Sequence, residues 1–250
     1  VKLFKVGDRV SHASMPIGAY SEKHIMPENK LVPVPDGVSD EVASCVTLKG
    51  ITAEYLLHRA YPLKKGDKVL YHAAAGALGQ ILCPWANSIG AEIIGTVGSK
   101  EKEEIAKKNG CHHVINYTDK DFVEEVEKIV GKNGIDVVYD GVGLKTFEGS
   151  IEVLKIRGMM VAFGNASGYV DTIDVKKHIN AKGLFFTRPS IAHYTIEREE
   201  LLESAKKVFN AVLSGKFKIE ISKKYSLDEV KQAHEDLEGR LLTGPAVIKP

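Results

Sequence analysis

The sequence predicts an α/β fold in which a doubly wound parallel sheet is joined to a smaller β-rich part. From Gly66 to about residue 164, short apolar runs alternate with segments of helical period, which is the pattern of consecutive βαβ units. Residues 1–40 instead carry closely spaced Pro and Gly between short extended runs, as small β structures do. At 250 residues the chain is long enough for two modest domains. We therefore expect residues 51–195 to form the parallel-sheet domain, and residues 1–50 and 196–250 to form the other.

The elements of the parallel-sheet domain are predicted from apolar runs, helix caps and breakers. A short apolar run before a turn predicts a strand, and apolar residues at helical spacing predict a helix until a Gly ends it, as Gly110 does. The predicted strands are Lys68–Ala73, Glu92–Val97, His113–Asn116, Asp136–Asp140 and Gly158–Gly164. The predicted helices are Ala75–Ile89, Lys100–Asn109, Asp121–Val130 and Thr146–Leu154.

The two ends of the chain carry fewer elements. Ser39 can cap a helix that begins at Asp40 and runs to about Leu57, with Gly50 kinking or dividing it. After Pro189 the predicted elements are a helix at Glu197–Leu213, a strand near Ile219–Ile221, a helix at Leu227–Glu238 and a strand near Ala246–Ile248. Val1–Val10 has the pattern of a turn that feeds a strand, where a domain rarely begins, so we expect residues upstream of Val1.

Composition and charge exclude several classes of function. The chain has 34 basic and 33 acidic residues, a formal charge of +1, so no nucleic-acid or membrane-surface partner is expected. It has neither an apolar run of membrane-spanning length nor the pattern of a signal peptide. The three widely spaced cysteines, Cys45, Cys83 and Cys111, indicate reduced thiols rather than a disulfide framework. We expect a cytoplasmic protein.

The turn after the first strand of the parallel-sheet domain matches a dinucleotide-binding fingerprint in all but one position. Residues 70–79, LYHAAAGALG, follow the Gly-x-Gly-x-x-Gly spacing, with Ala74 at the first glycine. Gly76 would let the backbone approach a pyrophosphate, Gly79 would let the helix pack close to the sheet, and the helix N-terminus would attract the phosphates. A small-residue βα turn without any ligand is the alternative.

The tip of the second strand lacks the acidic side chain that usually holds the ribose 2′-hydroxyl of NAD. Its sequence is GTVGS at 95–99, followed by Lys100, Glu101 and Lys102. A hydroxyl and two cations suit the 2′-phosphate of NADPH through charge-assisted hydrogen bonds. We therefore predict NADPH as the cofactor; the alternative is that these lysines are solvated charges at a helix start.

An ordered set of short motifs extends over essentially the whole chain. The motifs are GDRV at 7–10, LKG at 48–50, AxxGxxG at 73–79, GTVGS at 95–99, VINY at 114–117, VVYDGVG at 137–143, FGN at 163–165 and TRPS at 187–190. In this order they resemble the zeta-crystallin-type quinone oxidoreductases, zinc-independent members of the medium-chain dehydrogenase/reductase superfamily. The resemblance implies a Rossmann domain that binds NADPH and an incomplete GroES-like substrate domain, whose first part would lie upstream of this chain.

The resemblance also implies which residues hold NADPH. Those expected at the pyrophosphate and the 2′-phosphate are Ala75, Gly76, Ala77, Leu78, Gly98, Ser99, Lys102, Tyr117 and Arg240. Those expected at the cleft edge and the nicotinamide half are Thr52, Val142, Gly143, Phe163, Gly164, Asn165, Ala166, Phe186, Thr187 and Arg188. Tyr117 as a strand-end aromatic and Arg240 as an exposed helix-end cation are the alternatives.

No metal site is predicted, and no catalytic side chain can be assigned. No cysteine lies between Val10 and Leu31, and His12 and His24 alone do not make a zinc site. His112 and His113 are adjacent in a predicted strand, so their side chains point to opposite faces. The Gly-x-Ser-x-Gly elbow of hydrolases and the phosphate loop of nucleoside triphosphatases are both absent.

These features favour hydride transfer to a conjugated carbonyl, with the protein contributing binding and orientation. The expected substrate is a small-molecule quinone. The alternatives are an enoyl or alkenal reductase of the same fold, and an NADPH-binding protein without catalysis, such as the crystallins and RNA binders related to this family. The resemblance further implies a homodimer formed by sheet-edge pairing near Leu184–Phe186, an apolar run that would equally suit a buried strand.

Overall fold

The computed structural model describes residues 1–13, 15–239 and 241–250, and the chain divides into two units. Unit 1 comprises Val1–Glu54 and Ile191–Pro250, and unit 2 comprises Tyr55–Ser190. We predicted the domain boundaries between residues 50 and 51 and between residues 195 and 196. The boundaries of the two units along the chain lie between residues 54 and 55 and between residues 190 and 191. Unit 2 contains the elements of the predicted parallel-sheet domain.

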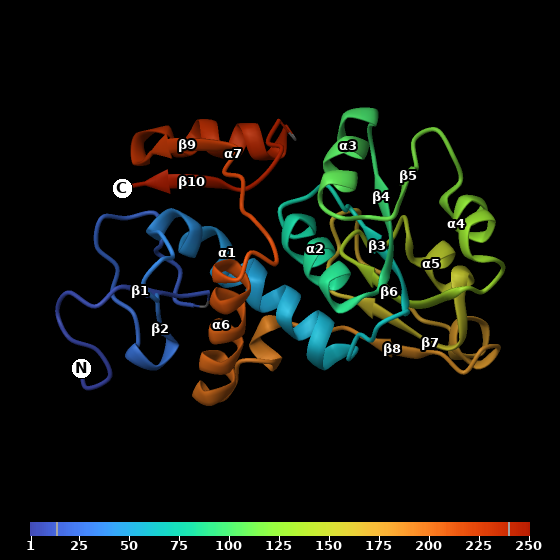
Figure 1. The fold of residues 1–250 in the computed structure, drawn as a ribbon, viewed down its shortest axis with the longest axis horizontal. Helices are drawn as coiled ribbons and strands as arrows, with labels where there is room; N and C mark the ends of the chain where they lie inside the picture. The colour runs from blue at the N-terminus through green and yellow to red at the C-terminus, as the bar shows by residue number, and fades with distance from the viewer. Residues whose placement is uncertain (14, 240) are drawn as a thin grey trace. The chain divides into compact units, whose positions relative to one another are not determined.

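Six parallel strands form the centre of unit 2 (Figure 1). They are β3 (Lys68–His72), β4 (Glu92–Val97), β5 (His113–Asn116), β6 (Ile135–Asp140), β7 (Leu154–Ala162) and β8 (Phe185–Thr187). Their order in the sheet is β5-β4-β3-β6-β7-β8, with every neighbouring pair parallel. This is the strand order of doubly wound dinucleotide-binding folds, and its direction reverses between β3 and β6. The predicted α/β fold with a doubly wound parallel sheet is confirmed.

Helices connect the strands and cover the sheet. They are α2 (Gly79–Ile89), α3 (Lys100–Lys108), α4 (Phe122–Val130) and α5 (Phe147–Val153), with short π-helical turns at Leu56–Ala60 and Val175–Asn180. Ser99 caps α3 and Asp121 caps α4 by accepting backbone N–H groups, which is why these helices begin where they do. Val126 of α4 and Phe147 of α5 pack with strand residues such as Leu70 in one buried apolar cluster.

Two predicted boundaries in unit 2 are wrong. Helix α2 begins at Gly79 and not at Ala75, because residues 73–78 form a turn in which Ala73 has a φ of +63°. Strand β7 begins at Leu154 and not at Gly158. Its pairing with β6 shifts register between Ile135 and Val137. The first residues of β7 lack the regular alternation of a strand in the sequence, so they were not predicted as part of it. The other predicted strands and helices of this unit agree with the structure to within two residues at each end.

The described residues of unit 1 form three longer helices and two small sheets. Its helices are α1 (Asp40–Tyr55), α6 (Arg198–Leu213) and α7 (Val230–Glu238), with short 3-10 turns at Glu28–Lys30, Ile191–His193 and Leu227–Glu229. Its strands are β1 (Val10–Ser11) and β2 (Val32–Pro33), which are antiparallel, and β9 (Lys223–Ser226) and β10 (Ala246–Lys249), which are parallel.

The strand predicted near Ile219–Ile221 is wrong, because the strand in this region is β9, at Lys223–Ser226. Tyr225 explains the shift. Its ring is buried, it pairs with Ile248 of β10, and its hydroxyl donates to Asp236 Oδ2 of α7 at 2.5 Å. One buried aromatic with a satisfied hydroxyl therefore outweighs two partly exposed isoleucines in placing the strand.

Helix α1 runs unbroken through Gly50, so the predicted kink or division there is wrong. A Cβ at position 50 would collide with the Val208 side chain of α6, so the glycine allows the two helices to pack closely. Close by, the fully buried Glu54 accepts hydrogen bonds from the Ser204 hydroxyl at 2.9 Å and from Lys207 Nζ at 3.1 Å. Paired in this way, a buried carboxylate ties α1 to α6.

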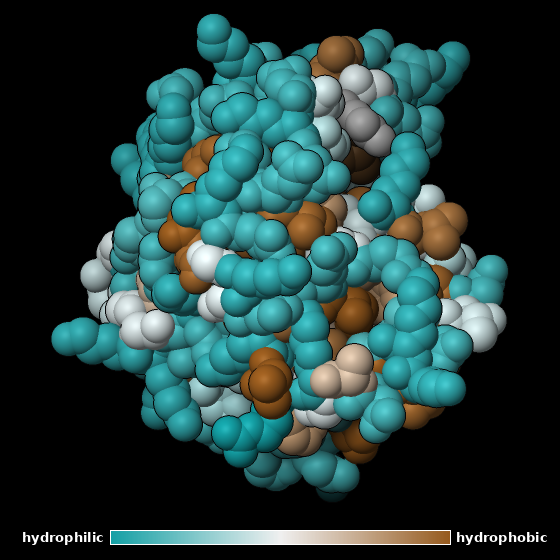
Figure 2. All heavy atoms as spheres, turned by 90° about the vertical axis from the view of Figure 1, so that its right-hand side faces the viewer, coloured by the Kyte–Doolittle hydropathy of each residue, from teal (hydrophilic) through white to brown (hydrophobic). Residues whose placement is uncertain are grey.

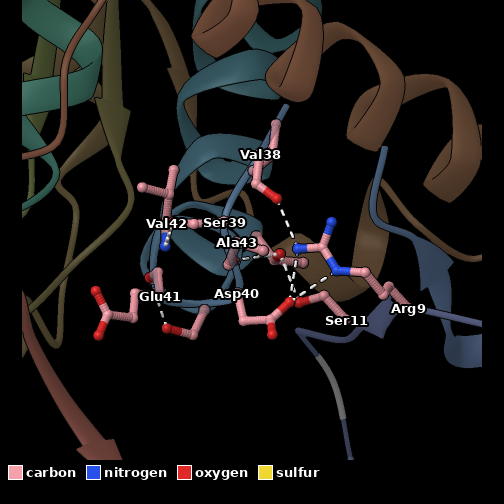
Figure 3. Close-up of polar contacts among 10 residues, drawn as sticks. Arg9, Ser11, Val38, Ser39, Asp40, Glu41, Val42 and Ala43 are labelled. Carbon is pink, nitrogen blue, oxygen red and sulfur yellow. Dashed lines mark hydrogen bonds and ion pairs between the residues drawn. The ribbon is translucent and has the colours of Figure 1, made fainter. Parts of the chain in front are cut away.

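Polar contacts hold the start of α1 (Figure 3). Ser39 accepts the Val42 N–H at 3.2 Å, as its predicted cap role requires. The Arg9 guanidinium donates to Asp40 Oδ1 and to the Val38 carbonyl oxygen, so the chain before β1 is fastened to the helix start.

The face of the protein shown in Figure 2 is mostly hydrophilic, and its apolar side chains are exposed in separate small groups. Among the described residues, no helix is long and apolar enough to cross a membrane.

Candidate dinucleotide-binding site

The turn between β3 and α2 lies at the carboxyl end of β3, beside the point where the strand order reverses. Gly79 packs so closely on this turn that a Cβ there would lie 2.7 Å from the Ala74 carbonyl carbon. A Cβ at Gly76 would meet only the Ala73 carbonyl oxygen, at 3.1 Å, and Gly76 itself is exposed. Gly79 therefore serves packing, whereas Gly76 keeps the outer side of the turn open to a ligand, as the fingerprint predicts.

The replacement of the first fingerprint glycine by Ala74 is accommodated from β4. A Cβ at Gly95 would lie 2.6 Å from the Ala74 methyl group and 2.7 Å from Cys111 Sγ. The Ala74 N–H donates to the Thr96 carbonyl oxygen at 3.0 Å, and the Asn109 side chain donates to the Ala74 carbonyl oxygen at 3.2 Å. The glycine on the neighbouring strand thus provides the space that the alanine takes up, and the turn keeps its tight form.

The turn offers unpaired backbone donors, as a phosphate site requires. In the part of the chain that the structure describes, the N–H groups of Ala77, Leu78 and Gly79 have no hydrogen-bond acceptor. Ala77 and Leu78 precede α2 and Gly79 is its first residue, so these N–H groups lie at the positive end of the helix dipole. Together with the open face at Gly76, this arrangement fits the diphosphate of a dinucleotide.

The tip of β4 brings four of the predicted residues together. A Cβ at Gly98 would lie 2.5 Å from the Tyr117 hydroxyl, so the phenol rests directly on this glycine while remaining 46% exposed. Ser99 Oγ accepts the Lys102 backbone N–H at 3.4 Å, which places Lys102 in the first turn of α3 next to the serine. No carboxylate forms a hydrogen bond or ion pair with Gly98, Ser99 or Lys102 among the described residues.

The loop after β6 is organised by a carboxylate. Asp140 is fully buried, and its Oδ1 accepts the backbone N–H groups of Val142 at 2.7 Å and Gly143 at 3.0 Å. Its Oδ2 accepts the Thr146 hydroxyl at 2.8 Å. The motif VVYDGVG contains this residue, but the expected site included only Val142 and Gly143. The signal was present, since an Asp at a strand end before Gly and Val can accept the N–H groups of the turn that follows.

The loop after β7 packs on the loop after β6. The Asp140 carbonyl oxygen accepts the N–H groups of Phe163 and Gly164, and the Gly141 carbonyl oxygen accepts that of Ala166 at 3.3 Å. A Cβ at Gly143, whose φ is +89°, would lie 3.1 Å from Asn165 Cα. The structure thus brings together the six predicted residues of these two loops, Val142, Gly143, Phe163, Gly164, Asn165 and Ala166.

Strand β8 carries the remaining predicted residues of unit 2 at or just after its end. The Phe186 ring lies edge-on to Phe147, with the ring centroids 6.3 Å apart. The Arg188 guanidinium donates to the Ala162 carbonyl oxygen at 2.9 Å, which fastens the residue after Thr187 to the end of β7. The turns and strand ends from β3 to β8 therefore present their predicted residues along one edge of the sheet.

The remaining two predicted residues are Thr52 and Arg240. Thr52 lies on α1 in unit 1, where its hydroxyl donates to the Leu48 carbonyl oxygen at 2.9 Å. Arg240 lies outside the described residues, so its predicted contact with the 2′-phosphate remains a prediction.

The buried imidazole of His72 connects the strand before the turn to neighbouring elements. His72 is the last residue of β3; its Nδ1 lies 2.9 Å from Thr96 Oγ1, and its Nε2 lies 2.9 Å from Ser150 Oγ. Burial lowers the pKa of the His72 imidazole, and the negative charge of Asp140 offsets that shift in part. The neutral imidazole is therefore favoured, and its two hydrogen bonds connect β3 to β4 and to α5.

Other chemistries find little support among the described residues. No group of three or more His, Cys, Asp or Glu side chains is placed to hold a metal ion, and the three cysteines are free and buried. Tyr61 and Lys65 have the Tyr-x-x-x-Lys spacing of short-chain reductases, but they precede β3, at the other end of the strands. Burial, with the nearby Asp67 and Asp136, raises the pKa of Tyr61 to about 12, which makes it a poor proton donor.

Comparison with known proteins agrees with this arrangement. Residues 77–214 match the family model described as zinc-binding dehydrogenase. A 2-haloacrylate reductase from Burkholderia is 45% identical over 99% of this chain and 75% of its own length. A quinone oxidoreductase from Pseudomonas aeruginosa is 40% identical over 100% of this chain and 77% of its own length.

Solved structures show the same relationship. The crystal structure of Escherichia coli quinone oxidoreductase in complex with NADPH superposes with a TM-score of 0.95 and 42% identity, over 100% of this chain and 77% of that one. The crystal structure of 2-haloacrylate reductase gives a TM-score of 0.94 and 44% identity, over 100% of this chain and 79% of that one. The strand order, the fingerprint turn and these similarities agree: the chain belongs to the quinone oxidoreductase family of the medium-chain dehydrogenases/reductases.

Proposed function

We propose that this protein is an NADPH-dependent oxidoreductase that reduces quinones. The observation that carries the proposal is the fingerprint turn at the strand-order reversal, followed by a β4 tip with a hydroxyl and a lysine and without an acid. The NADPH complex of the E. coli relative supports the choice of cofactor.

The residues of unit 2 divide the cofactor between them. The open turn at Ala75, Gly76, Ala77 and Leu78 takes the diphosphate, and Gly98, Ser99, Lys102 and Tyr117 take the adenosine ribose and its 2′-phosphate. The loops after β6 and β7, with Phe186, Thr187 and Arg188, line the nicotinamide half. Because charge-assisted hydrogen bonds to phosphate are strong and the tip lacks a competing carboxylate, NADPH is preferred over NADH.

The reaction needs little from the protein beyond binding and orientation. The bound dihydronicotinamide supplies a hydride; a quinone that accepts it and one proton from water becomes a hydroquinone, and NADPH becomes NADP⁺. The chain holds the two reactants in line. No side chain has to act as an acid, because water can protonate the oxyanion of the product.

The two units have separate roles in this proposal. Unit 2 binds the cofactor, and unit 1 represents part of the GroES-like substrate domain.

Strand β8 is an edge strand of the sheet, and Phe185 on it is 56% exposed, which supports a homodimer formed by pairing of two β8 edges.

A second substrate class is favoured by one comparison. The 2-haloacrylate reductase from Burkholderia is as similar to this chain as the quinone oxidoreductases are. A 2-haloacrylate is a conjugated, electron-poor alkene, so the same hydride donor would reduce its carbon–carbon double bond.

The test is competitive turnover. NADPH oxidation is followed by the loss of its nicotinamide absorbance with a benzoquinone, a 2-alkenal and 2-chloroacrylate, singly and in pairs. The proposal expects the largest kcat/KM with the quinone. Preference for an alkene substrate identifies an enone or haloacrylate reductase, and tight NADPH binding without oxidation by any acceptor identifies a binding protein without catalysis.

A further inference from the structure

We propose that Asp140 is the positioning residue of the nicotinamide half of the cleft. It is neither a ligand of the cofactor nor a catalytic group; it sets the two loops that form that half. The inference rests on the proposed function, because it presupposes that NADPH is bound along this edge of the sheet.

The side chain of Asp140 shapes the loop after β6. Its two oxygens accept three hydrogen bonds, from the N–H groups of Val142 and Gly143 and from the Thr146 hydroxyl. These acceptors draw the backbone into a turn that Gly143 completes with a φ of +89°. Without the carboxylate, the N–H groups of Val142 and Gly143 would lose their acceptor, and the Thr146 hydroxyl would keep only the Gly143 carbonyl oxygen, at 3.1 Å.

The main chain of Asp140 and of the turn it forms shapes the loop after β7. The Asp140 carbonyl oxygen accepts the Phe163 N–H at 2.9 Å, and the Val142 carbonyl oxygen accepts both the N–H and the hydroxyl of Ser167 at 2.8 Å. Ser167 Oγ in turn accepts the Lys145 N–H at 3.0 Å. Displacement of the Val142–Gly143 turn would therefore carry the 163–168 loop with it.

The environment of the carboxylate is unusual for a purely structural residue. Asp140 is 0% exposed, and no lysine or arginine among the described residues forms an ion pair with it. His72, on which the charge of Asp140 acts, is favoured in its neutral form because burial lowers its pKa. A buried carboxylate without an ion-pair partner depends on its hydrogen bonds, and here all three come from the loop that Asp140 positions.

Asp136 provides a matched control on the same strand. It is also a buried aspartate of β6, it accepts the Lys68 N–H at 2.7 Å, and it pairs with Lys155 Nζ. It lies four residues before Asp140, about 13 Å along an extended strand, and towards the opposite end of the sheet. Loss of Asp136 should therefore lower stability without reaching the cleft.

The experiment compares two ligands on a set of variants. NADPH occupies the whole cleft, whereas adenosine 2′,5′-bisphosphate occupies only the adenosine half. Their dissociation constants are measured by calorimetry for the wild type, Asp140→Ala, Asp140→Asn and Asp136→Ala, with thermal unfolding of each. We expect Asp140→Ala to bind NADPH roughly tenfold more weakly and the bisphosphate unchanged. We expect Asp140→Asn, which keeps an acceptor for the two N–H groups, to recover most of the loss.

The outcomes distinguish failure of the proposed function from failure of the positioning role of Asp140. If the wild type binds neither ligand, the proposed function fails. If the wild type binds both, but Asp140→Ala weakens both equally or neither, or Asp136→Ala shows the same selective loss, the positioning role is contradicted. Should Asp140→Ala not fold, Thr146→Val replaces it with Thr146→Ser as the rescue variant, and the same selective loss of NADPH affinity, roughly threefold, is expected.

Discussion

The two turns that flank the strand-order reversal are built in opposite ways. Up to Leu78 the β3–α2 turn consists of Ala and Gly, and it is held mainly by backbone hydrogen bonds and by close packing of Gly79 on Ala74. The β6–α5 loop is held by side chains, with Asp140 and Thr146 at its centre. Both lie at the carboxyl ends of adjacent strands.

The difference follows from what each turn is expected to contact. A diphosphate needs backbone N–H groups and an approach free of side chains, so the first turn contains nothing larger than a methyl group before Leu78. A nicotinamide ring needs a binding surface of fixed shape, and the conformation of the second loop is held by hydrogen bonds to the buried Asp140 carboxylate. Substitutions in the first turn should act through steric clash, and those in the second through lost hydrogen bonds.

The largest effect is expected for Gly79→Val, which tests the packing side of the first turn. Because even a Cβ at this position would collide with the Ala74 backbone, the free energy of unfolding should fall by more than about 2 kcal/mol. Urea denaturation measures it. A variant as stable as the wild type would show that the turn is not closely packed.

Gly76→Val is the matched variant on the open side of the same turn. Its Cβ would meet only one backbone oxygen, so the free energy of unfolding should change by less than about 1 kcal/mol. The valine would occupy the approach to the diphosphate, and the dissociation constant of NADPH should rise roughly tenfold or more, which fluorescence titration measures. Unchanged NADPH affinity in this folded variant would mean that the diphosphate lies elsewhere.

A smaller effect is expected beneath the two turns, at His72. Burial depresses its pKa in the folded state below the ordinary 6.5, so the stabilisation that it provides is complete above about pH 6.5 and is lost as the pH falls through the lowered folded-state value. The free energy of unfolding of the wild type should therefore decrease between pH 7.5 and pH 5.5 more steeply than that of His72→Gln. Parallel curves for the two proteins would contradict this account of the imidazole.

The sequence predicted most of unit 2, because its strands are apolar runs bounded by clear caps and breakers. Ser99 and Asp121 begin their helices as helix caps do. The order of the strands and the start of α2 could not be predicted from spacing alone, since periodicity does not say which strands are neighbours and an alanine-rich turn resembles a helix. In unit 1, Gly50 has the pattern of a helix breaker, but its role is set by Val208, which lies far away in the sequence.

The candidate site was predicted unevenly for a similar reason. The glycines and the β4 tip follow from a local motif, and the structure places Tyr117 on Gly98 and the two late loops on one another. Asp140 was missed although an Asp at a strand end can accept the N–H groups of the turn that follows, because the contact of its loop with the loop after β7 forms only on folding. Gly95 was missed as the partner of Ala74 because the two meet only through pairing of β3 and β4.

The most direct test of the account is the preference between NADPH and NADH, which differ only in the 2′-phosphate expected at the β4 tip. Their dissociation constants are measured by nicotinamide fluorescence for the wild type and for Lys102→Ala. The account predicts that the wild type binds NADPH at least about tenfold more tightly than NADH, and that Lys102→Ala loses most of this preference while its affinity for NADH is unchanged. Equal binding of both cofactors by the wild type, or tighter binding of NADH, would contradict it.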